Sequence, residues 1–162
     1  MNFLKKLFNK SKIQTGANNS ILRQKAKEVE KITPAVLDIV KKITEIIGEN
    51  RYQTPGLINI GLAAPQISQS LRIIAFREWP AQNIIVLINP RITRQSKNRI
   101  VMEESCLSLP GIVVLVERAA RTTVQGLDIN GRKIEIRAKG FLARMIQHEI
   151  DHLDGILITD YA

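Results

Sequence analysis

Apolar residues recur along this chain at two different spacings, and the change from one to the other outlines the fold. Between Thr33 and Gly48 the spacing is helical. The apolar stripe consists of Val36, Leu37, Ile39, Val40, Ile43, Ile46 and Ile47. Thr33 is suited to the N-cap, Pro34 to the first helical position and Gly48 to the end of the helix. We therefore predict a core-packing helix here and assign it no chemistry.

Short β-branched apolar segments follow this helix and indicate strands. They cover residues 71–76, 84–88, 99–102, 112–117, 122–127 and 133–137. A second helix is predicted over residues 141–153, ended by Gly155, and a last short strand at 156–158. One helix, a run of strands and a second helix predict an α+β fold, with antiparallel or mixed β-sheets packed around the second helix.

Length and charge add limits to this outline. The 162 residues suit a single domain over 1–162, within which the basic residues 1–19 are predicted to be loosely ordered. No apolar run reaches the length of a membrane span. The net charge of +9 favours polyanionic surroundings. With aromatics at only 4%, a base-stacking platform is not expected, so the charge indicates either a basic solvated surface or work near ribosomal RNA.

Both histidines of the chain fall in the second predicted helix, as His148-Glu149-Ile150-Asp151-His152. A spacing of four residues is about one helical turn, roughly 5.4 Å of rise, so both imidazoles project from one face. Two imidazoles can hold one divalent transition metal, and the adjacent Glu149 can take a proton from metal-bound water. Two buried core histidines are the alternative, and the specificity of the motif favours the metal.

A two-histidine site needs a third protein ligand. Related proteases place a third histidine three residues after the glycine, but that position is Ile158 here. Asp154 and Asp160 are the only carboxylates downstream of the second histidine. The best candidate is upstream, the single cysteine Cys106. A lone cysteine is most often a small buried hydrophobe, but beside an incomplete metal site it is the preferred ligand.

Three motifs in order resemble those of the peptide deformylase family. Residues 59–66 read Asn-Ile-Gly-Leu-Ala-Ala-Pro-Gln, residues 104–108 read Glu-Ser-Cys-Leu-Ser and residues 147–152 read Gln-His-Glu-Ile-Asp-His. The family pattern has glycine where this chain has Asn59 and Ser105. Asn59 is compatible with the loop, because asparagine tolerates positive φ better than other non-glycine residues. Ser105 puts a side chain beside the expected peptide and bears on substrate range.

The resemblance implies the chemistry of the site. Cys106, His148 and His152 would hold one divalent metal, with Fe²⁺ as the natural ion and Zn²⁺, Ni²⁺ or Co²⁺ able to replace it. The catalytic groups would be the Glu149 carboxylate as proton carrier and two donors to the developing oxyanion. Those two donors would be the Gln66 side-chain amide and the backbone N–H of Leu107.

The resemblance also implies a substrate, N-formylmethionyl nascent peptides, and formate as a product. The peptide would lie as an extended strand along Ile60, Gly61 and Ser105. A methionine pocket would be walled by Phe141 and Met145, one helical turn apart, together with Ile60, although ordinary core packing explains this arrangement equally well. The implied enzyme is a cytoplasmic, bacterial-type monomer with a transient ribosome contact, and an organellar or virus-encoded origin stays open.

Two other functions fit part of the pattern. A metallopeptidase that cleaves internal peptide bonds would use the helix motif, but it leaves Cys106 and Gln66 without a role. A non-catalytic relative that binds formylated chains or ribosomes would fit the charge and the two glycine replacements. Formate release from a formylated peptide separates these alternatives from a deformylase.

Overall fold

The computed structural model describes residues 13–49, 60–77 and 83–162. Its helices and strands are, in chain order, α2 (Pro34–Glu49), β1 (Ile60–Ala63), the 3-10 helix η2 (Ala64–Ile67), β2 (Ile73–Arg77), β3 (Ile84–Gln95), β4 (Arg99–Cys106), β5 (Leu109–Ala119), β6 (Arg121–Leu127), β7 (Lys133–Lys139), α3 (Gly140–Leu153) and the 3-10 helix η3 (Ile158–Tyr161). The predicted α+β class is confirmed. No helix in the described ranges has the length and hydrophobicity needed to cross a bilayer.

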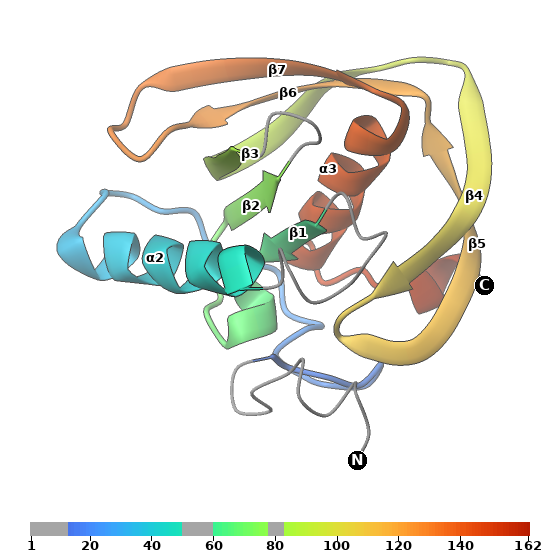
Figure 1. The fold of residues 1–162 in the computed structure, drawn as a ribbon, viewed down its shortest axis with the longest axis horizontal. Coiled ribbons are helices and arrows are strands. Elements are labelled where there is room, and N and C mark those ends of the chain that lie inside the picture. Colours follow the sequence, from blue (N-terminus) through green and yellow to red (C-terminus); the bar gives the residue numbers. More distant parts are fainter. Residues whose placement is uncertain (1–12, 50–59, 78–82) are drawn as a thin grey trace.

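The strands form two antiparallel sheets around α3 (Figure 1). One sheet has five strands in the order β1-β2-β3-β6-β7, and the other is the long β4–β5 hairpin. Strand β2 shows how the core divides. Ile74 and Phe76 join the cluster that packs on α3, whereas Ile73 and Ala75 join the cluster that packs on α2. The two helices therefore cover opposite faces of the five-stranded sheet.

The first helix starts as the sequence predicts and ends one residue later. The Thr33 hydroxyl accepts a hydrogen bond from the Val36 N–H at 3.4 Å, and Pro34 is the first helical residue. Gly48 does not end the helix, which continues to Glu49. The apolar stripe is buried at Val36, Val40, Ile43, Ile46 and Ile47.

The strand predicted at 156–158 is wrong. Gly155 turns the chain with a φ of 74°, and residues 158–161 form the 3-10 helix η3. The Leu157 N–H is satisfied locally by the Asp160 carboxylate at 2.9 Å rather than by a neighbouring strand. Leu157 and Ile158 are buried because they pack into a small core cluster beside β5, not because they join a sheet. The hydrophobicity of this run reflects its packing in that cluster and does not indicate a strand.

Residues 13–19 correct another expectation, that the first 19 residues are loosely ordered. The Gln14 N–H donates to the Gln66 carbonyl at 2.7 Å, and the Gly16 N–H donates to the Ser108 carbonyl at 2.9 Å. Leu22 follows and is fully buried in the cluster that contains Cys106. This part of the segment is attached to the body of the molecule, and residues 1–12 lie outside the described ranges.

Candidate active site

Helix α3 brings the two histidines together as the spacing predicts. The ring centroids of His148 and His152 are 5.0 Å apart, with an angle of 75° between the ring planes. His152 is buried, and burial holds its pKa well below the usual value, so its imidazole is neutral. A neutral imidazole is the form that binds a metal.

Strand β4 delivers Cys106 to the same place. Its sulfur lies 3.2 Å from His152 Nε2. The ligand atoms available on Cys106, His148 and His152 all fall within 4.8 Å of one another. Cys106 is the last residue of β4, where a two-residue turn closes the hairpin and pairs it with Leu109. The end of the hairpin thus meets the middle of α3.

The surroundings of His148 fit a bound cation. The ring donates from Nδ1 to the Glu104 carboxylate at 3.0 Å, which leaves Nε2 as the ligand atom. Burial would lower the pKa of His148, but hydrogen bonds with Cys106 and Glu104 raise it to about 10. The site therefore stabilises positive charge at this ring. One thiolate and two imidazoles suit a zinc or ferrous ion, so the donor set fits one divalent transition metal.

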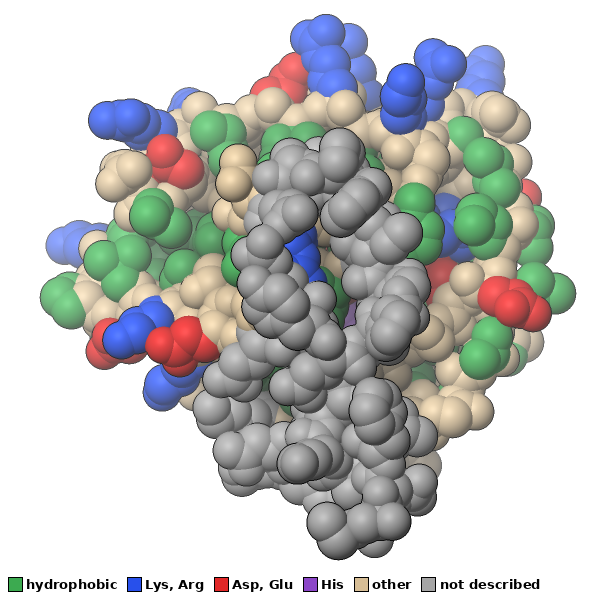
Figure 2. Space-filling view, in the orientation of Figure 1, with side chains coloured by type: hydrophobic (Ala, Val, Ile, Leu, Met, Phe, Trp, Pro, Cys, Tyr) green, Lys and Arg blue, Asp and Glu red, His purple; other side chains and the backbone are tan. Residues whose placement is uncertain are grey.

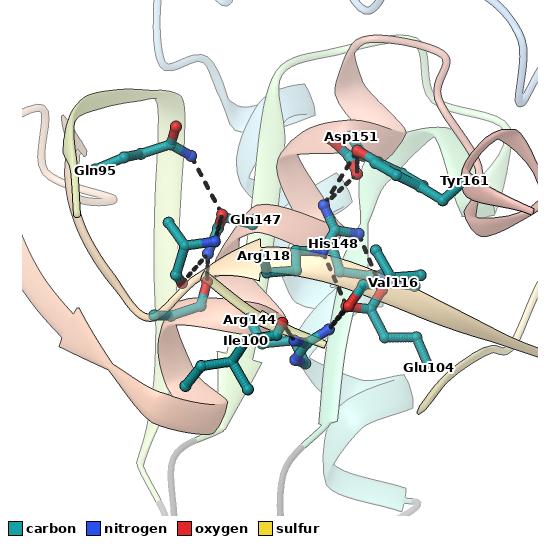
Figure 3. A network of polar contacts seen from close by, with 12 residues as sticks. Gln95, Ile100, Glu104, Val116, Arg118, Arg144, Gln147, His148, Asp151 and Tyr161 are labelled. Atoms are coloured by element: carbon teal, nitrogen blue, oxygen red, sulfur yellow. Dashed lines mark hydrogen bonds and ion pairs between the residues drawn. The ribbon is translucent and has the colours of Figure 1, made fainter. Parts of the chain in front are cut away.

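Glu104 is the centre of a buried polar network that ties the hairpin to the helix (Figure 3). Arg118 donates to both its oxygens at 2.9 Å, and Arg144 donates to it at 2.7 Å. Burial would raise the pKa of Glu104, but the hydrogen bonds from Arg118 and His148 lower it to about 2. The carboxylate is therefore ionised at neutral pH and fixes the orientation of the His148 ring.

Arg118 extends this network to α3 and η3 (Figure 3). Its Nη1 donates to Asp151 at 2.6 Å, and the Tyr161 hydroxyl donates to the same carboxylate oxygen at 2.8 Å. The guanidinium also lies 4.9 Å from the centre of the Tyr161 ring. Arg118 on β5 thus links Glu104, which orients the His148 ring, to Asp151, which is on the same helix as both histidines.

Glu149 lies beside the cluster with one oxygen unsatisfied. The side chain is buried, and its Oε2 has no hydrogen-bond partner among the described residues. Burial raises the pKa of this carboxyl to about 7. Gly61 makes room for it, because a Cβ at that position would come within 2.4 Å of Glu149 Oε1. The Gly61 backbone therefore approaches the Glu149 side chain closely.

Gln66 points its side-chain amide at the cysteine. Its Oε1 accepts from the Ala63 N–H at 2.8 Å, which fixes the orientation of the amide. Its Nε2 then donates to Ser108 Oγ at 3.1 Å and lies 3.8 Å from Cys106 Sγ. Leu107 is in the turn directly after the cysteine. Both predicted oxyanion donors thus lie beside Cys106.

The residues predicted to bind substrate lie in several different parts of the structure. Gly61 adjoins Glu149, but Ile60 belongs to the core beneath α2 and Met145 to the core beneath α3. Phe141 is 48% exposed and belongs to neither core. Ser105 is exposed, on the opposite face of β4 from Glu104 and Cys106. Asn59 lies outside the described residues.

Sequence reasoning assigned no role to four groups of this network, Glu104, Arg118, Asp151 and Arg144. Glu104 could have been found, since it is two residues before Cys106 and so on the same face of a strand. Arg118 had no comparable signal, because residues 112–116 are all apolar and do not indicate which face of the strand is buried. Nothing in the sequence indicates that these groups meet.

A thiolate from β4, together with two imidazoles and a buried carboxylate from α3, defines the class of protein, a mononuclear metallohydrolase. The family model described as polypeptide deformylase matches residues 11–162. A protein of Halothermothrix orenii named peptide deformylase is 46% identical over 140 residues, 86% of each chain. The chain belongs to the polypeptide deformylase family.

Solved structures agree with this assignment. The peptide deformylase of Synechococcus elongatus, solved in complex with actinonin, superposes with a TM-score of 0.81 and 34% identity over 93% of this chain and 77% of that one. A probable peptide deformylase from Synechococcus phage S-SSM7 gives 0.82 and 32% over 93% and 99%. The chain is accordingly a deformylase, an enzyme of the hydrolase class, and not a non-catalytic relative.

Proposed function

We propose that this chain removes the formyl group from N-formylmethionyl nascent peptides with Cys106, His148 and His152 as the metal ligands and Glu149 as the proton carrier. The observation that carries this proposal is a sulfur–imidazole cluster beside the buried carboxylate of Glu149. Glu149 is on the helix that carries both histidines, and its Oε2 has no hydrogen-bond partner among the described residues. When bound, the metal ion supplies a water of lowered pKa and polarises the formyl oxygen.

The protein's own groups then complete the reaction. Glu149, with a pKa near 7, can accept a proton from the attacking water and return it to the leaving amine. Developing negative charge on the formyl oxygen is met by the Gln66 amide, which the Ala63 N–H holds in the donating orientation, and by the Leu107 N–H. The products are formate and a free N-terminus.

The peptide would bind along β1. This strand pairs with β2 on one side and has no strand partner on its other side among the described residues, and the same holds for β4 beyond its pairing with β5. An extended peptide adding to such an edge is held by backbone hydrogen bonds that do not depend on sequence. Ser105 contributes its backbone rather than its side chain, because that side chain faces away from Cys106.

The ion, the location and the assembly are also inferred. A thiolate–imidazole set accepts Fe²⁺, which the family resemblance favours, and also Zn²⁺, Ni²⁺ or Co²⁺. Metal analysis of anaerobically purified protein identifies the ion, and activity that survives prolonged aeration would argue against ferrous iron. We place the enzyme in the cytoplasm, near ribosomes and their nascent chains. Since one chain supplies all the proposed groups, it would act as a monomer, which light scattering checks.

The test is formate release from formyl-Met-Ala-Ser by the metal-loaded protein. Glu149→Ala should abolish release while the metal content stays unchanged. Cys106→Ser should lower metal affinity sharply, because the soft third ligand becomes hard. Cleavage of the peptide bond without formate would favour an internal peptidase. Wild-type metal content and turnover in Cys106→Ser would remove the cysteine from the ligand set.

A further inference from the structure

The described helices cover only half of the outer face of the five-stranded sheet. Helix α2 packs on β1, β2 and the first half of β3, where Ile73, Ala75 and Ile88 face it. Beyond Ile88 no helix of the described ranges covers the outer face, and along β6 and β7 exposed residues alternate with buried or partly buried ones. The buried ones, such as Val124 and Ala138, face α3 on the inner side.

The uncovered half of the outer face is strongly basic. Its six cations, all exposed, define the basic sheet face and are Arg91, Arg94, Arg121, Lys133, Arg137 and Lys139. The register places them side by side, with Arg121 opposite Lys139, and with Arg94 and Arg137 on either side of Thr123. Figure 2 shows Lys and Arg side chains projecting from the edge of the molecule along which β6 and β7 run in Figure 1.

Few acids balance these charges. Glu135 is the only acidic residue of the described strands on this face, and it pairs with Arg137 at 3.0 Å. Arg91 pairs with Glu28, which reaches the face from the segment before α2. The other four cations form no ion pair with any residue in the described ranges. A surface of this kind attracts a polyanion, because neutralising its charges releases the counterions of both partners.

We propose that the basic sheet face binds structured RNA through the phosphate backbone. Arginines predominate, and their planar guanidinium groups match phosphate oxygens bidentately. No aromatic residue lies in 91–95, 121–127 or 133–139, so the face offers no stacking for single-stranded bases. An anionic membrane is the other polyanion, but membrane-surface binding also uses inserted apolar side chains. Of the outward-facing residues of β6 and β7, only Leu127 is apolar, and it packs toward the α2 core. Ile129, in the turn between these strands, is 46% exposed, and a single apolar side chain is a small surface for membrane insertion.

Binding at this face leaves the active site accessible. His148, His152 and Glu149 are on α3, which covers the opposite face of the same sheet, and Cys106 reaches them from the end of β4. RNA bound to the basic sheet face would therefore leave the edges of β1 and β4 accessible to a peptide. This inference deepens the proposed function, because it names the surface that would contact the ribosome. RNA binding can nevertheless be tested independently of deformylation.

The test measures binding of a fluorescently labelled RNA hairpin by anisotropy over a salt series. The variant combines Arg94→Gln, Arg121→Gln and Lys139→Gln, none of which breaks an ion pair with a described residue. The control combines Lys25→Gln, Lys41→Gln and Lys42→Gln, which removes the same charge from exposed positions on α2 and at Lys25. The sheet variant should lose about one phosphate contact per substitution, so its salt slope should fall by roughly two to three and its affinity by on the order of tenfold or more.

The outcomes separate the explanations. Equal weakening in both triple variants would mean diffuse attraction by net charge, and unchanged binding in the sheet variant would mean another surface; either result overturns the proposal. Vesicles rich in phosphatidylserine are the second probe, and stronger binding to them than to the hairpin would assign the face to membranes instead. Formate release from formyl-Met-Ala-Ser should be wild-type in both variants, which shows that they fold and keeps this test independent of the proposed catalysis.

Discussion

Replacing Glu104 by glutamine tests whether the buried network positions the metal ligands. The substitution keeps the size of the side chain but removes the charge on which Arg118, Arg144 and His148 converge. Removing one partner of a buried ion pair costs about 3–5 kcal/mol. We expect the lower end, about 3 kcal/mol, because Arg118 keeps its bond to Asp151. The protein should still fold, since domains of this kind have about 5–15 kcal/mol of stability.

The same variant should bind metal more weakly. Loss of the carboxylate that orients a ligating histidine costs roughly 10–100-fold in affinity. Urea unfolding of the metal-free protein measures the first effect, and a competition titration with a chelating dye measures the second. The matched control is Glu103→Gln, the neighbouring residue on the exposed face of β4. If both variants had the same unfolding midpoint and the same metal affinity, the positioning role of Glu104 would be refuted.

Three further predictions concern other parts of the fold. Gly61→Ala should lower kcat by on the order of a hundredfold, because its Cβ would displace the Glu149 carboxylate, and a shift of about 1 Å at a reacting group has that effect. Formate assays measure it, and Gly48→Ala, which meets no atom within 4 Å, should be active. Leu22→Ala should cost about 2–5 kcal/mol in denaturant unfolding, since the side chain is fully buried, and a loss well below 1 kcal/mol would mean that this segment is dispensable. Asp160→Asn should cost at most about 1 kcal/mol at pH 7, because its ion pair is partly exposed. The hydrogen bond from Arg23 lowers the pKa of Asp160, so the stabilisation by this ion pair is present above the unfolded pKa of 3.8 and fades as the pH falls below it. A cost of the substitution that persists at pH 2 would contradict the ion-pair explanation.

Local spacing in the sequence was enough to predict helix α3 and the placement of both histidines on one face of it. One turn separates His148 from His152, and this geometry does not depend on the rest of the chain. The helix start at Thr33 and Pro34 was predictable for the same reason. The strand β1 was not, because Gly61 and Ala63 have low β propensity, and the segment is extended only because β2 pairs with it.

Contacts between residues far apart in the sequence determine the part of the site that local patterns could not predict. Arg118 meets Glu104 because the β4–β5 register carries both to the inner face, and it meets Asp151 because that face packs on α3. Such a register is fixed by the whole sheet, not by the residues near the charge. The methionine pocket predicted from Met145 illustrates the converse. Its spacing from Phe141 is a true helical turn, yet Met145 is part of the core beneath the helix.

The charged network has a mechanical reason to exist at this site. The metal ligands come from two elements, the end of a two-stranded hairpin and a helix, and the hairpin belongs to neither face of the larger sheet. A hairpin of two strands is marginally stable by itself and free to shift against its neighbour. Arg144 donates from α3 to the Val116 carbonyl as well as to Glu104, and Arg118 binds Asp151 in return. These bonds cross between hairpin and helix in both directions, so they fix the distance from sulfur to imidazole on which a tight metal site depends.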